Sequence, residues 1–193
     1  LTGLPDDFLL FAAPMGDYLD VEKGLKVCVS SWRRVDDNMM PTRAKITGGY
    51  VNCALAKSEA LDNGFDEAIF LNSSGHVAEG SAENLFIVRD GALITPPVTA
   101  DILEGITRAT LIELARRELG IETIERPIDR TELYIAEEAF LVGTGAQWSP
   151  IASVDHRILG DGRPGPLSRK IQKLYFDVVR GRLESYRPWC TPV

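Results

Sequence analysis

A predicted β-hairpin in the middle of the chain is the feature that most constrains its fold. Two short apolar runs, 84–88 and 92–94, flank the dipeptide Asp90-Gly91. An Asp-Gly pair between such runs is a strong signal for a tight turn joining antiparallel strands. A hairpin of this kind does not fit a regular series of βαβ units. We therefore expect an α+β fold, in which a mixed sheet folds over into a pseudo-barrel with helices around it.

Strand and helix patterns fill the rest of the chain around this hairpin. Apolar side chains that alternate with polar ones predict strands, whereas apolar side chains three and four residues apart predict helices. The expected strands are 26–32, 68–71, 139–142 and 151–154. The expected helices are 49–62, a helix between Gly105 and Gly120, an acidic helix 131–138, and a final helix over 167–178.

Charge and composition limit the classes of partner. The formal net charge is −7, and a phosphate backbone requires clustered Lys and Arg, so we expect no nucleic-acid partner. With 45% hydrophobic residues, the 193-residue chain is able to bury a real core. No apolar run is long enough to cross a bilayer, and no signal-peptide pattern is present, which predicts no membrane association.

Cysteine and histidine usage points in the same direction. The three cysteines have no CxxC spacing, which indicates neither a disulfide framework nor a zinc site and favours the reducing cytoplasm. Only two histidines are present, so a histidine triad or a histidine-bound metal is disfavoured, and we expect no metal. Chemistry must come from Lys, Tyr, carboxylates or a cofactor.

Lys45 is the first candidate for such chemistry. It stands in the segment Arg43-Ala-Lys-Ile-Thr-Gly-Gly-Tyr50, between a loop and a helix, and the small residues beside it leave room for a ligand. Because most lysines are exposed, an ordinary solvated surface lysine is the alternative interpretation.

Three further segments have the composition of binding loops. Glu79-Gly-Ser-Ala-Glu-Asn84 places two carboxylates before an apolar strand, or is simply a polar turn. Leu103-Glu-Gly-Ile-Thr107 leads into a helix whose free first amides suit a phosphate, unless that helix is capped in the ordinary way. The turn Gly143-Thr-Gly-Ala146 is able to aim backbone amides at an anion. Trp148 lines a pocket or packs in the core, and the core is favoured.

Together these segments resemble the fold-type IV pyridoxal-phosphate enzymes, and within them the branched-chain amino-acid aminotransferases. Glu79-Gly-Ser-Ala-Glu-Asn-Leu-Phe86 is similar to the family's EGxxENLF signature, and Ser30-Ser-Trp-Arg33 resembles the SSWxR strand of the branched-chain members. The segment around Lys45 and the loops at 103–108 and 143–146 also match in order. The resemblance covers nearly the whole chain and implies the family's large domain over residues 1–193.

The resemblance assigns a role to each matching residue. It implies that Lys45 links covalently to the aldehyde of pyridoxal phosphate, that Tyr50 hydrogen-bonds the phenolate oxygen, and that Glu79 pairs with the pyridine nitrogen. It further implies that the phosphate and the substrate carboxylate are bound by Ile106, Thr107, Thr144 and Gly145, with Thr144 serving both.

The implied reaction is transamination of L-leucine, L-isoleucine and L-valine with 2-oxoglutarate by a ping-pong mechanism. In this scheme Lys45 carries the proton between the substrate Cα and the cofactor. A D-amino-acid aminotransferase, an amine transaminase or an aminodeoxychorismate lyase would use the same lysine and glutamate. A non-catalytic fragment that retains an assembly interface is the alternative from another class.

The sequence also departs from the family pattern. Ile46-Thr47, Glu104, Gly145 and Gln147 stand where other residues are common, and nothing corresponds to the family's smaller N-terminal domain. The chain begins at Leu1 rather than Met, so we expect it to be part of a longer protein. The resemblance implies a homodimer or larger homo-oligomer. We expect the 193 residues alone to bind cofactor weakly and to transaminate poorly, because half of the cavity wall is missing.

Overall fold

A mixed sheet forms the centre of the fold in the computed structural model, which describes residues 3–14, 19 and 23–191. Over these residues the sheet has nine strands, in the order β3-β2-β1-β8-β7-β4-β5-β6, with β9 paired to β8. Their bounds are β1 Leu25–Arg33, β2 Glu67–Leu71, β3 Val77–Gly80, β4 Asn84–Arg89, β5 Ala92–Thr95, β6 Thr123–Glu125, β7 Glu138–Gly143, β8 Gln147–Val154 and β9 Arg157–Ile158. The expected hairpin is present, because β4 and β5 pair antiparallel around Asp90-Gly91.

The sheet folds over on itself, as its connections require. Strands β2, β1, β8 and β7 lie between β3 and β4 in the sheet order. Yet only residues 81–83 connect β3 to β4 along the chain, and the amide of Gly80 donates to the carbonyl oxygen of Glu83 at 2.7 Å in a tight turn. A connection this short brings the end strand β3 back beside β4. The expected pseudo-barrel is therefore confirmed.

Both faces of the central strands are buried, which explains their nearly continuous apolar sequences. In β4, Leu85 and Ile87 point into the core enclosed by the curled sheet, together with Ile69, Leu141 and others. Phe86 and Val88 point to the opposite face, where helices cover them. This alternation follows from the period-two geometry of a strand.

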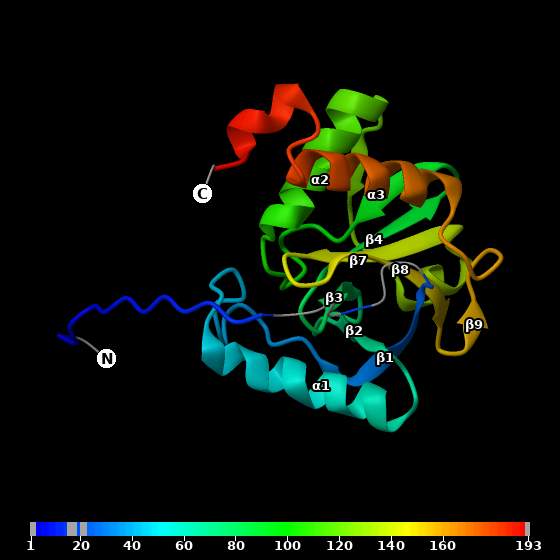
Figure 1. The fold of residues 1–193 in the computed structure, drawn as a ribbon. Helices are drawn as coiled ribbons and strands as arrows, with labels where there is room; N and C mark the ends of the chain where they lie inside the picture. Colours follow the sequence, from blue (N-terminus) through cyan, green and yellow to red (C-terminus); the bar gives the residue numbers. More distant parts are fainter. Residues whose placement is uncertain (1–2, 15–18, 20–22, 192–193) are drawn as a thin grey trace.

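The helices form two layers outside the sheet (Figure 1). One layer contains α1 (Tyr50–Asp62), which lies over β1 and β2 and presents the small buried residues Cys53, Ala56 and Ala60 to them. The other contains α2 (Ile106–Leu119) and α3 (Pro166–Val179), which pack on β4 and β7. Three 3-10 helices complete the described elements: η1 (Thr47–Gly49), η2 (Arg130–Ile135) and η3 (Glu184–Trp189).

The helix boundaries follow from local chemistry. Gly120 ends α2 with φ +64°, a left-handed conformation that glycine adopts without steric cost. The expected acidic helix over 131–138 is wrong, because only η2 forms and Glu138 already belongs to β7. The Glu138 carboxylate accepts hydrogen bonds from the first amides of α3, Leu167 and Ser168, at 3.1 and 2.7 Å. Glu138 thus caps a different helix instead of extending η2.

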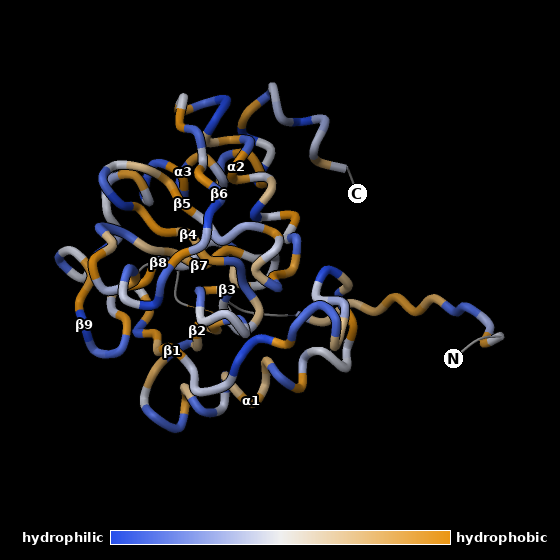
Figure 2. The backbone as a smooth tube through the Cα atoms, turned by 180° about the vertical axis from the view of Figure 1, so that it is seen from behind, coloured by the Kyte–Doolittle hydropathy of each residue, from blue (hydrophilic) through white to orange (hydrophobic). Residues whose placement is uncertain are grey.

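Trp148 packs in the core, as favoured from the sequence, since it is fully buried and its ring centre lies 5.1 Å from that of Phe140. At the other extreme, the side chains of Phe8 to Phe11 are 81–84% exposed, in an extended segment that leaves the body of the fold. Figure 2 shows this segment as a hydrophobic stretch that points into solvent. Within the described residues, no helix combines the length and apolar character needed to cross a membrane.

Candidate cofactor site

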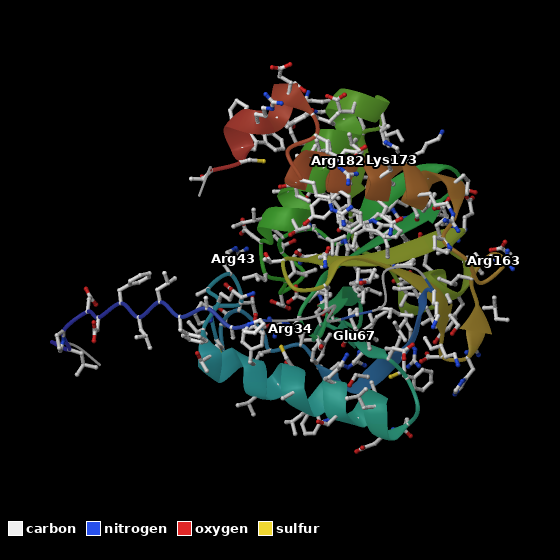
Figure 3. All side chains as sticks on the ribbon, viewed as in Figure 1. Arg34, Arg43, Glu67, Arg163, Lys173 and Arg182 are labelled. Carbon is white, nitrogen blue, oxygen red and sulfur yellow. The ribbon has the colours of Figure 1, made fainter. Side chains whose placement is uncertain are left out.

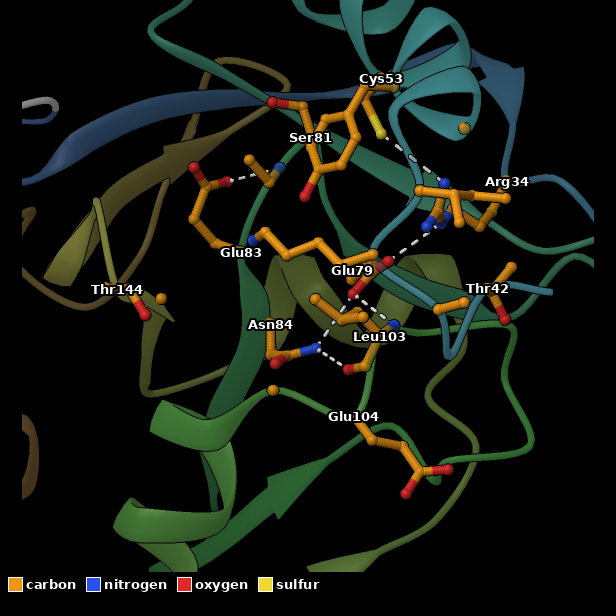
Figure 4. A pocket seen from close by; sticks show the side chains of 18 of the residues that line it. Arg34, Thr42, Cys53, Glu79, Ser81, Glu83, Asn84, Leu103, Glu104 and Thr144 are labelled. Carbon is orange, nitrogen blue, oxygen red and sulfur yellow. Dashed lines mark hydrogen bonds and ion pairs between the residues drawn. The ribbon is translucent and has the colours of Figure 1, made fainter. Parts of the chain in front are cut away.

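A cavity of about 420 Å³ opens where the sheet closes on itself, between α1, the turn after β3 and the start of α2. The loop at 41–46, residues 79–84 and residues 103–107 line it, together with the turn after β7. Three of these segments are binding loops expected from the sequence, and the Lys45 segment provides the fourth wall. The fold therefore collects residues that lie up to about a hundred positions apart along the chain (Figure 4).

Glu79 is the most firmly held side chain of the cavity. Its Oε1 accepts a hydrogen bond from Nε of Arg34 at 2.9 Å, and its Oε2 accepts from Nδ2 of Asn84 at 3.0 Å. The amide of Leu103 donates to the same Oε2 at 3.1 Å. Figure 4 shows the carboxyl group between these three donors. Three donors from three separate segments fix its position and favour its charged form.

The environment also brings the titration of Glu79 close to neutrality. Burial raises the pKa of Glu79 to about 7, although Arg34, the Leu103 amide and Lys45 lower it. Only 5% of the residue is exposed. A buried carboxylate that is poised near neutral pH pairs well with a cationic group in the same cavity.

Unlike the buried Glu79, Lys45 lies on an exposed part of the cavity wall. It belongs to an exposed loop before η1, and it lines the cavity. Its Nζ lies 5.7 Å from the centre of the Tyr50 ring, and its charge contributes to the pKa of Glu79. The amine and the carboxyl group therefore share one cavity, and both Lys45 and Tyr50 take part in lining it.

The start of α2 offers open hydrogen-bond donors. Gly105 precedes the helix, and no side chain caps its first amides. Ile106 and Thr107, which come first in the helix, both line the cavity. Unpaired amides at a positive helix end form a site for a phosphate group. Burial raises the pKa of Tyr175, and a hydrogen bond with the side chain of Thr107 offsets part of this rise.

Gly105 is required for the close packing at this corner. A Cβ atom at this position would lie 2.1 Å from Oδ1 of Asn84. The Asn84 amide has no freedom to move away, because its nitrogen donates both to Glu79 and to the carbonyl oxygen of Leu103, at 2.8 Å. Asn84 therefore fixes the position of the Glu79 carboxylate relative to the loop at 103–107, which we call the phosphate-type loop.

The turn after β7 contributes only part of what the sequence suggested. Gly143 and Thr144 line the cavity, but Gly145 is not among its lining residues. Thr144 is exposed, and Figure 4 shows it across the cavity from Arg34. Among the described residues, no group of three His, Cys, Asp or Glu side chains is arranged to hold a metal ion.

The sequence analysis did not identify the ionic partner of Glu79. This partner is Arg34, whose side chain is only 9% exposed and forms the ion pair with Glu79. Glu83, the second carboxylate of the expected binding loop at 79–84, is 2% exposed and lines the cavity. Arg108 pairs with Glu125 and Pro96 instead of facing the cavity. The spacing within 79–84 was the available signal for the two acids, and no local pattern marked Arg34.

The donor set favours one kind of ligand. The primary amine of Lys45 is suited to an aldehyde. The buried carboxylate of Glu79, with its pKa near neutrality, is suited to a basic ring nitrogen. The uncapped amides at the start of α2 are suited to a phosphate group. Figure 3 places Arg34 inside the fold and Arg43 at its edge. Arg43 forms an ion pair with Glu104 at 2.7 Å, linking the Lys45 loop to the loop before α2 at the cavity mouth.

Sequence comparison finds a matching family and relatives that are about half identical to this chain. The family model described as amino-transferase class IV matches residues 5–154. The probable branched-chain-amino-acid aminotransferase of Aquifex aeolicus is 51% identical over 187 residues, which are 97% of this chain and 60% of the relative. The branched-chain-amino-acid aminotransferase of Pseudomonas aeruginosa is 47% identical over 195 residues, covering 100% of this chain and 63% of the relative. The chain thus spans about three fifths of the length of these relatives.

Solved structures agree with the sequence matches. The branched-chain aminotransferase of Thermoproteus uzoniensis with norvaline superposes with a TM-score of 0.89 and 52% identity, covering 93% of this chain and 59% of that one. The branched-chain amino acid aminotransferase of Thermobaculum terrenum in its PLP form has a TM-score of 0.87 and 50% identity, covering 89% of this chain and 56% of that one.

Proposed function

The chain belongs to the amino-transferase class IV family, and from this premise we propose that it carries the cofactor site of a branched-chain amino-acid aminotransferase. The reaction is the transfer of the amino group of L-leucine, L-isoleucine or L-valine to 2-oxoglutarate, with pyridoxal 5'-phosphate as cofactor, by a ping-pong mechanism. The observation that carries this proposal is the shared cavity of Lys45 and Glu79, beside the open start of α2.

Pyridoxal phosphate fits the donor set of this cavity. Lys45 would hold the aldehyde carbon, Tyr50 the phenolate oxygen and Glu79 the ring nitrogen. The uncapped amides of Ile106 and Thr107, together with Thr144, would hold the phosphate group. The close approach of Asn84 to Gly105 supports this assignment, because it fixes the carboxylate relative to the phosphate-type loop.

When bound, pyridoxal phosphate supplies an electron-withdrawing ring that stabilises negative charge at the substrate Cα. The residues of the chain control protons around that ring. An ionised Glu79, held by Arg34, keeps a proton on the ring nitrogen. With the cofactor bound, the Nζ of Lys45 would be the group that accepts and returns the proton of the substrate Cα. The amide of Thr144, which lines the cavity, would bind the substrate carboxylate, and the amide of Gly145, one residue beyond the lining, would join it.

The apolar part of the cavity wall supports aliphatic substrates. Between the polar groups the wall contains the side chains of Val35, Met40, Ile46, Leu103, Ile106 and Val142. Such side chains accommodate the hydrocarbon branches of leucine, isoleucine and valine without polar groups left unpaired. The names of the relatives in Aquifex aeolicus and Pseudomonas aeruginosa point to the same substrates.

We further propose that residues 1–193 form the cofactor-binding large domain, and that sequence beyond this region completes the cavity wall. The exposed apolar run Phe8 to Phe11 and the exposed side of Lys45 support this division. The same proposal includes assembly as a homodimer or larger homo-oligomer. A cytoplasmic location is supported by the free cysteines Cys28, Cys53 and Cys190.

Substrate assays on the full-length protein loaded with pyridoxal phosphate test this function. We expect glutamate to form from 2-oxoglutarate with the three branched-chain L-amino acids, at kcat/KM values at least about tenfold above those for D-alanine. Initial rates at several concentrations of both substrates should give parallel double-reciprocal lines. Lys45→Ala is the control for background transfer.

Other outcomes would assign the cavity to another member of the family. A preference for D-amino acids or for primary amines without a carboxylate, or release of pyruvate from aminodeoxychorismate, would contradict the proposal. So would sequential kinetics with leucine.

Residues 1–193 expressed alone test the proposed division of the protein. We expect weaker binding of pyridoxal phosphate and slow transamination of leucine, because part of the cavity wall is missing and water enters the site. Turnover of leucine at the rate of the full-length protein would contradict this expectation.

A further inference from the structure

Glu83 is a second buried acid of the cavity, and two glycines make room for it. A Cβ atom on Gly80 would lie 2.7 Å from Oε2 of Glu83. A Cβ atom on Gly143 would lie 3.3 Å from the carbonyl oxygen of Ala82 and 3.8 Å from Glu83 itself. A larger residue at Gly80 would displace the Glu83 carboxyl group, whereas one at Gly143 would press on the Ala82 carbonyl oxygen and remain in ordinary contact with Glu83. The fold thus accommodates this carboxyl group in a confined place.

The Glu83 carboxyl group is only half satisfied. Its Oε2 accepts a hydrogen bond from the amide of Ala82 at 3.2 Å. Its Oε1 is buried and has no hydrogen-bond partner within the described part of the chain. An unpaired buried polar atom costs about 1–3 kcal/mol of folding free energy. A hydrogen-bond donor in the cavity that Glu83 lines would therefore stabilise this oxygen.

The surrounding charges are mostly negative. Glu67 of β2, which is fully buried and paired with Lys57 of α1 at 2.6 Å, and Glu79 of β3 both disfavour a charge on Glu83. Burial and then Glu67 raise the pKa of Glu83 to about 8, while the Ala82 amide and Lys57 lower it. Burial raises the pKa of the Cys53 thiol in α1; Arg34 lowers it, and Glu79 and Glu83 add to the rise. Glu83 therefore tends to hold its proton at neutral pH as long as no cation lies beside its unpaired oxygen.

A cation in the cavity is the partner that such an acid lacks. Of the described side chains that line the cavity, two are basic, Arg34 and Lys45. The guanidinium of Arg34 is already occupied by Glu79 and by Sγ of Cys53, at 2.9 and 3.6 Å. Lys45 forms no hydrogen bond or ion pair with the described residues. Figure 4 shows the Glu83 carboxyl group on the side of the cavity away from Arg34.

We propose that Glu83 is a positioning residue for Lys45: rotation of the exposed Lys45 side chain brings its amine to the unpaired Oε1 of Glu83 while that amine is not bonded to a cofactor or substrate. The inference rests on the proposed role of Lys45. When the amine is free, the Glu83 proton moves to Nζ and gives an ammonium-carboxylate pair. When Nζ must act as a neutral base or nucleophile, the same proton returns to Glu83. The net charge of the pair stays zero in both states, so no charge enters the cavity uncompensated.

The pH dependence of Lys45 acetylation tests this pairing in the cofactor-free, full-length protein. Acetic anhydride reacts with the neutral amine, and peptide mass spectrometry gives the rate at Lys45 at each pH. We expect Glu83→Gln, which keeps the shape of the side chain but not its charge, to lower the midpoint pH by about one unit. At neutral pH this shift corresponds to about tenfold faster labelling.

Glu104→Gln is the matched control, since it removes one negative charge at the cavity mouth without touching the buried acid. We expect it to shift the midpoint by no more than about 0.3 unit, because the charge is half exposed. Glu83→Asp keeps the carboxyl group but withdraws it by one methylene, and its midpoint should lie between those of wild type and Glu83→Gln. Wild-type midpoints in every folded Glu83 variant, or equal shifts in Glu83→Gln and Glu104→Gln, overturn the inference.

The cofactor link separates this inference from the proposed function. Pyridoxal phosphate trapped on Lys45, together with an acetylation midpoint that is unchanged in the Glu83 variants, would support the proposed function and show that the pairing is wrong. If the cofactor attaches elsewhere while the midpoint still responds to Glu83, the pairing stands and the proposed function is wrong.

Discussion

The acid end of the cavity, at Glu79, and its amine end, at Lys45, differ in how firmly the protein holds the side chain. Glu79 is held by three donors and is almost fully buried, whereas Lys45 lies in an exposed loop with its Nζ 5.7 Å from the centre of the Tyr50 ring. The acid end is therefore organised by the fold itself, before any ligand binds. The amine end depends on what enters the cavity or covers it. Substitutions at the two ends should accordingly separate loss of activity from loss of stability.

Lys45→Ala should have the largest effect on activity and almost none on stability. We expect transamination to fall to background, at least about 10⁴-fold in kcat, because the nucleophile and proton carrier are lost together. The free energy of unfolding should change by no more than about 0.5 kcal/mol, as for other exposed positions. Urea unfolding followed by circular dichroism measures the second quantity. A loss above about 2 kcal/mol would show that the amine end is structural as well.

Arg34→Met should give the largest loss of stability. It leaves the Glu79 carboxylate buried without its ionic partner, which costs about 3–5 kcal/mol for a pair of this kind. Urea unfolding of the double variant with Glu79→Gln should recover a large part of this loss, because the uncompensated charge is then gone. If the single and double variants are equally unstable, the ion pair is not what organises the acid end.

The free energy of unfolding should decrease by a few kcal/mol as the pH rises. Burial raises the pKa values of Glu79 and Glu83 to about 7 and about 8, above the value of an unfolded chain. The folded state then holds protons that the unfolded state releases, so the stabilisation is complete below about pH 4 and is lost as the pH passes about 8. Urea unfolding across this range measures the slope. Glu83→Gln should flatten it, and a rise of stability over the same range would contradict both assignments.

A pair of glycine substitutions compares the two ends without changing any charge. Gly105→Ala, at the acid end, would bring its Cβ to 2.1 Å from the fixed Asn84 amide and should cost about 1–3 kcal/mol. Gly48→Ala, near Lys45, meets no atom within 4 Å and should cost no more than about 0.5 kcal/mol. Thermal unfolding of both variants decides the comparison. Equal losses would mean that the two ends are equally tightly packed.

The smallest effect is expected at the cavity mouth. Arg43 and Glu104 are about half exposed, so their ion pair should contribute about 0.2–1 kcal/mol in a double-mutant cycle at low salt. The coupling should weaken at high salt because solvent ions screen it. A coupling above about 2 kcal/mol would show that this pair, rather than the Tyr50 contact, holds the Lys45 loop.

The sequence predicted the fold class and most of the elements, because their signals are local. The Asp90-Gly91 turn, the Gly120 stop and the apolar run of β4 each depend on neighbouring residues alone. The acidic helix was wrong because a distant requirement, the capping of α3 by Glu138, placed that residue in a strand.

The candidate site was predictable only in part. Motif resemblance gathered Lys45, Glu79 and the start of α2, which the fold brings to one cavity. It did not find Arg34, because the contact with Glu79 reaches from the residue after β1 across the intervening strand β2 to β3. Nor did it predict that Glu83 is buried, since its position depends on the tight turn in which Gly80 closely approaches Glu83. Contacts of this kind are set by the packed structure and not by a local sequence pattern.

Borohydride reduction of the full-length protein after addition of pyridoxal phosphate tests the central claim most directly. The claim is that the amine of Lys45 and the carboxylate of Glu79 act on one ligand. We predict that peptide mass spectrometry finds the reduced cofactor on Lys45, and that the visible absorbance of the linked cofactor is absent in Lys45→Ala but present, with a shifted maximum, in Glu79→Gln. A label on Lys57 or another lysine, or a spectrum that does not change in Glu79→Gln, would contradict the claim.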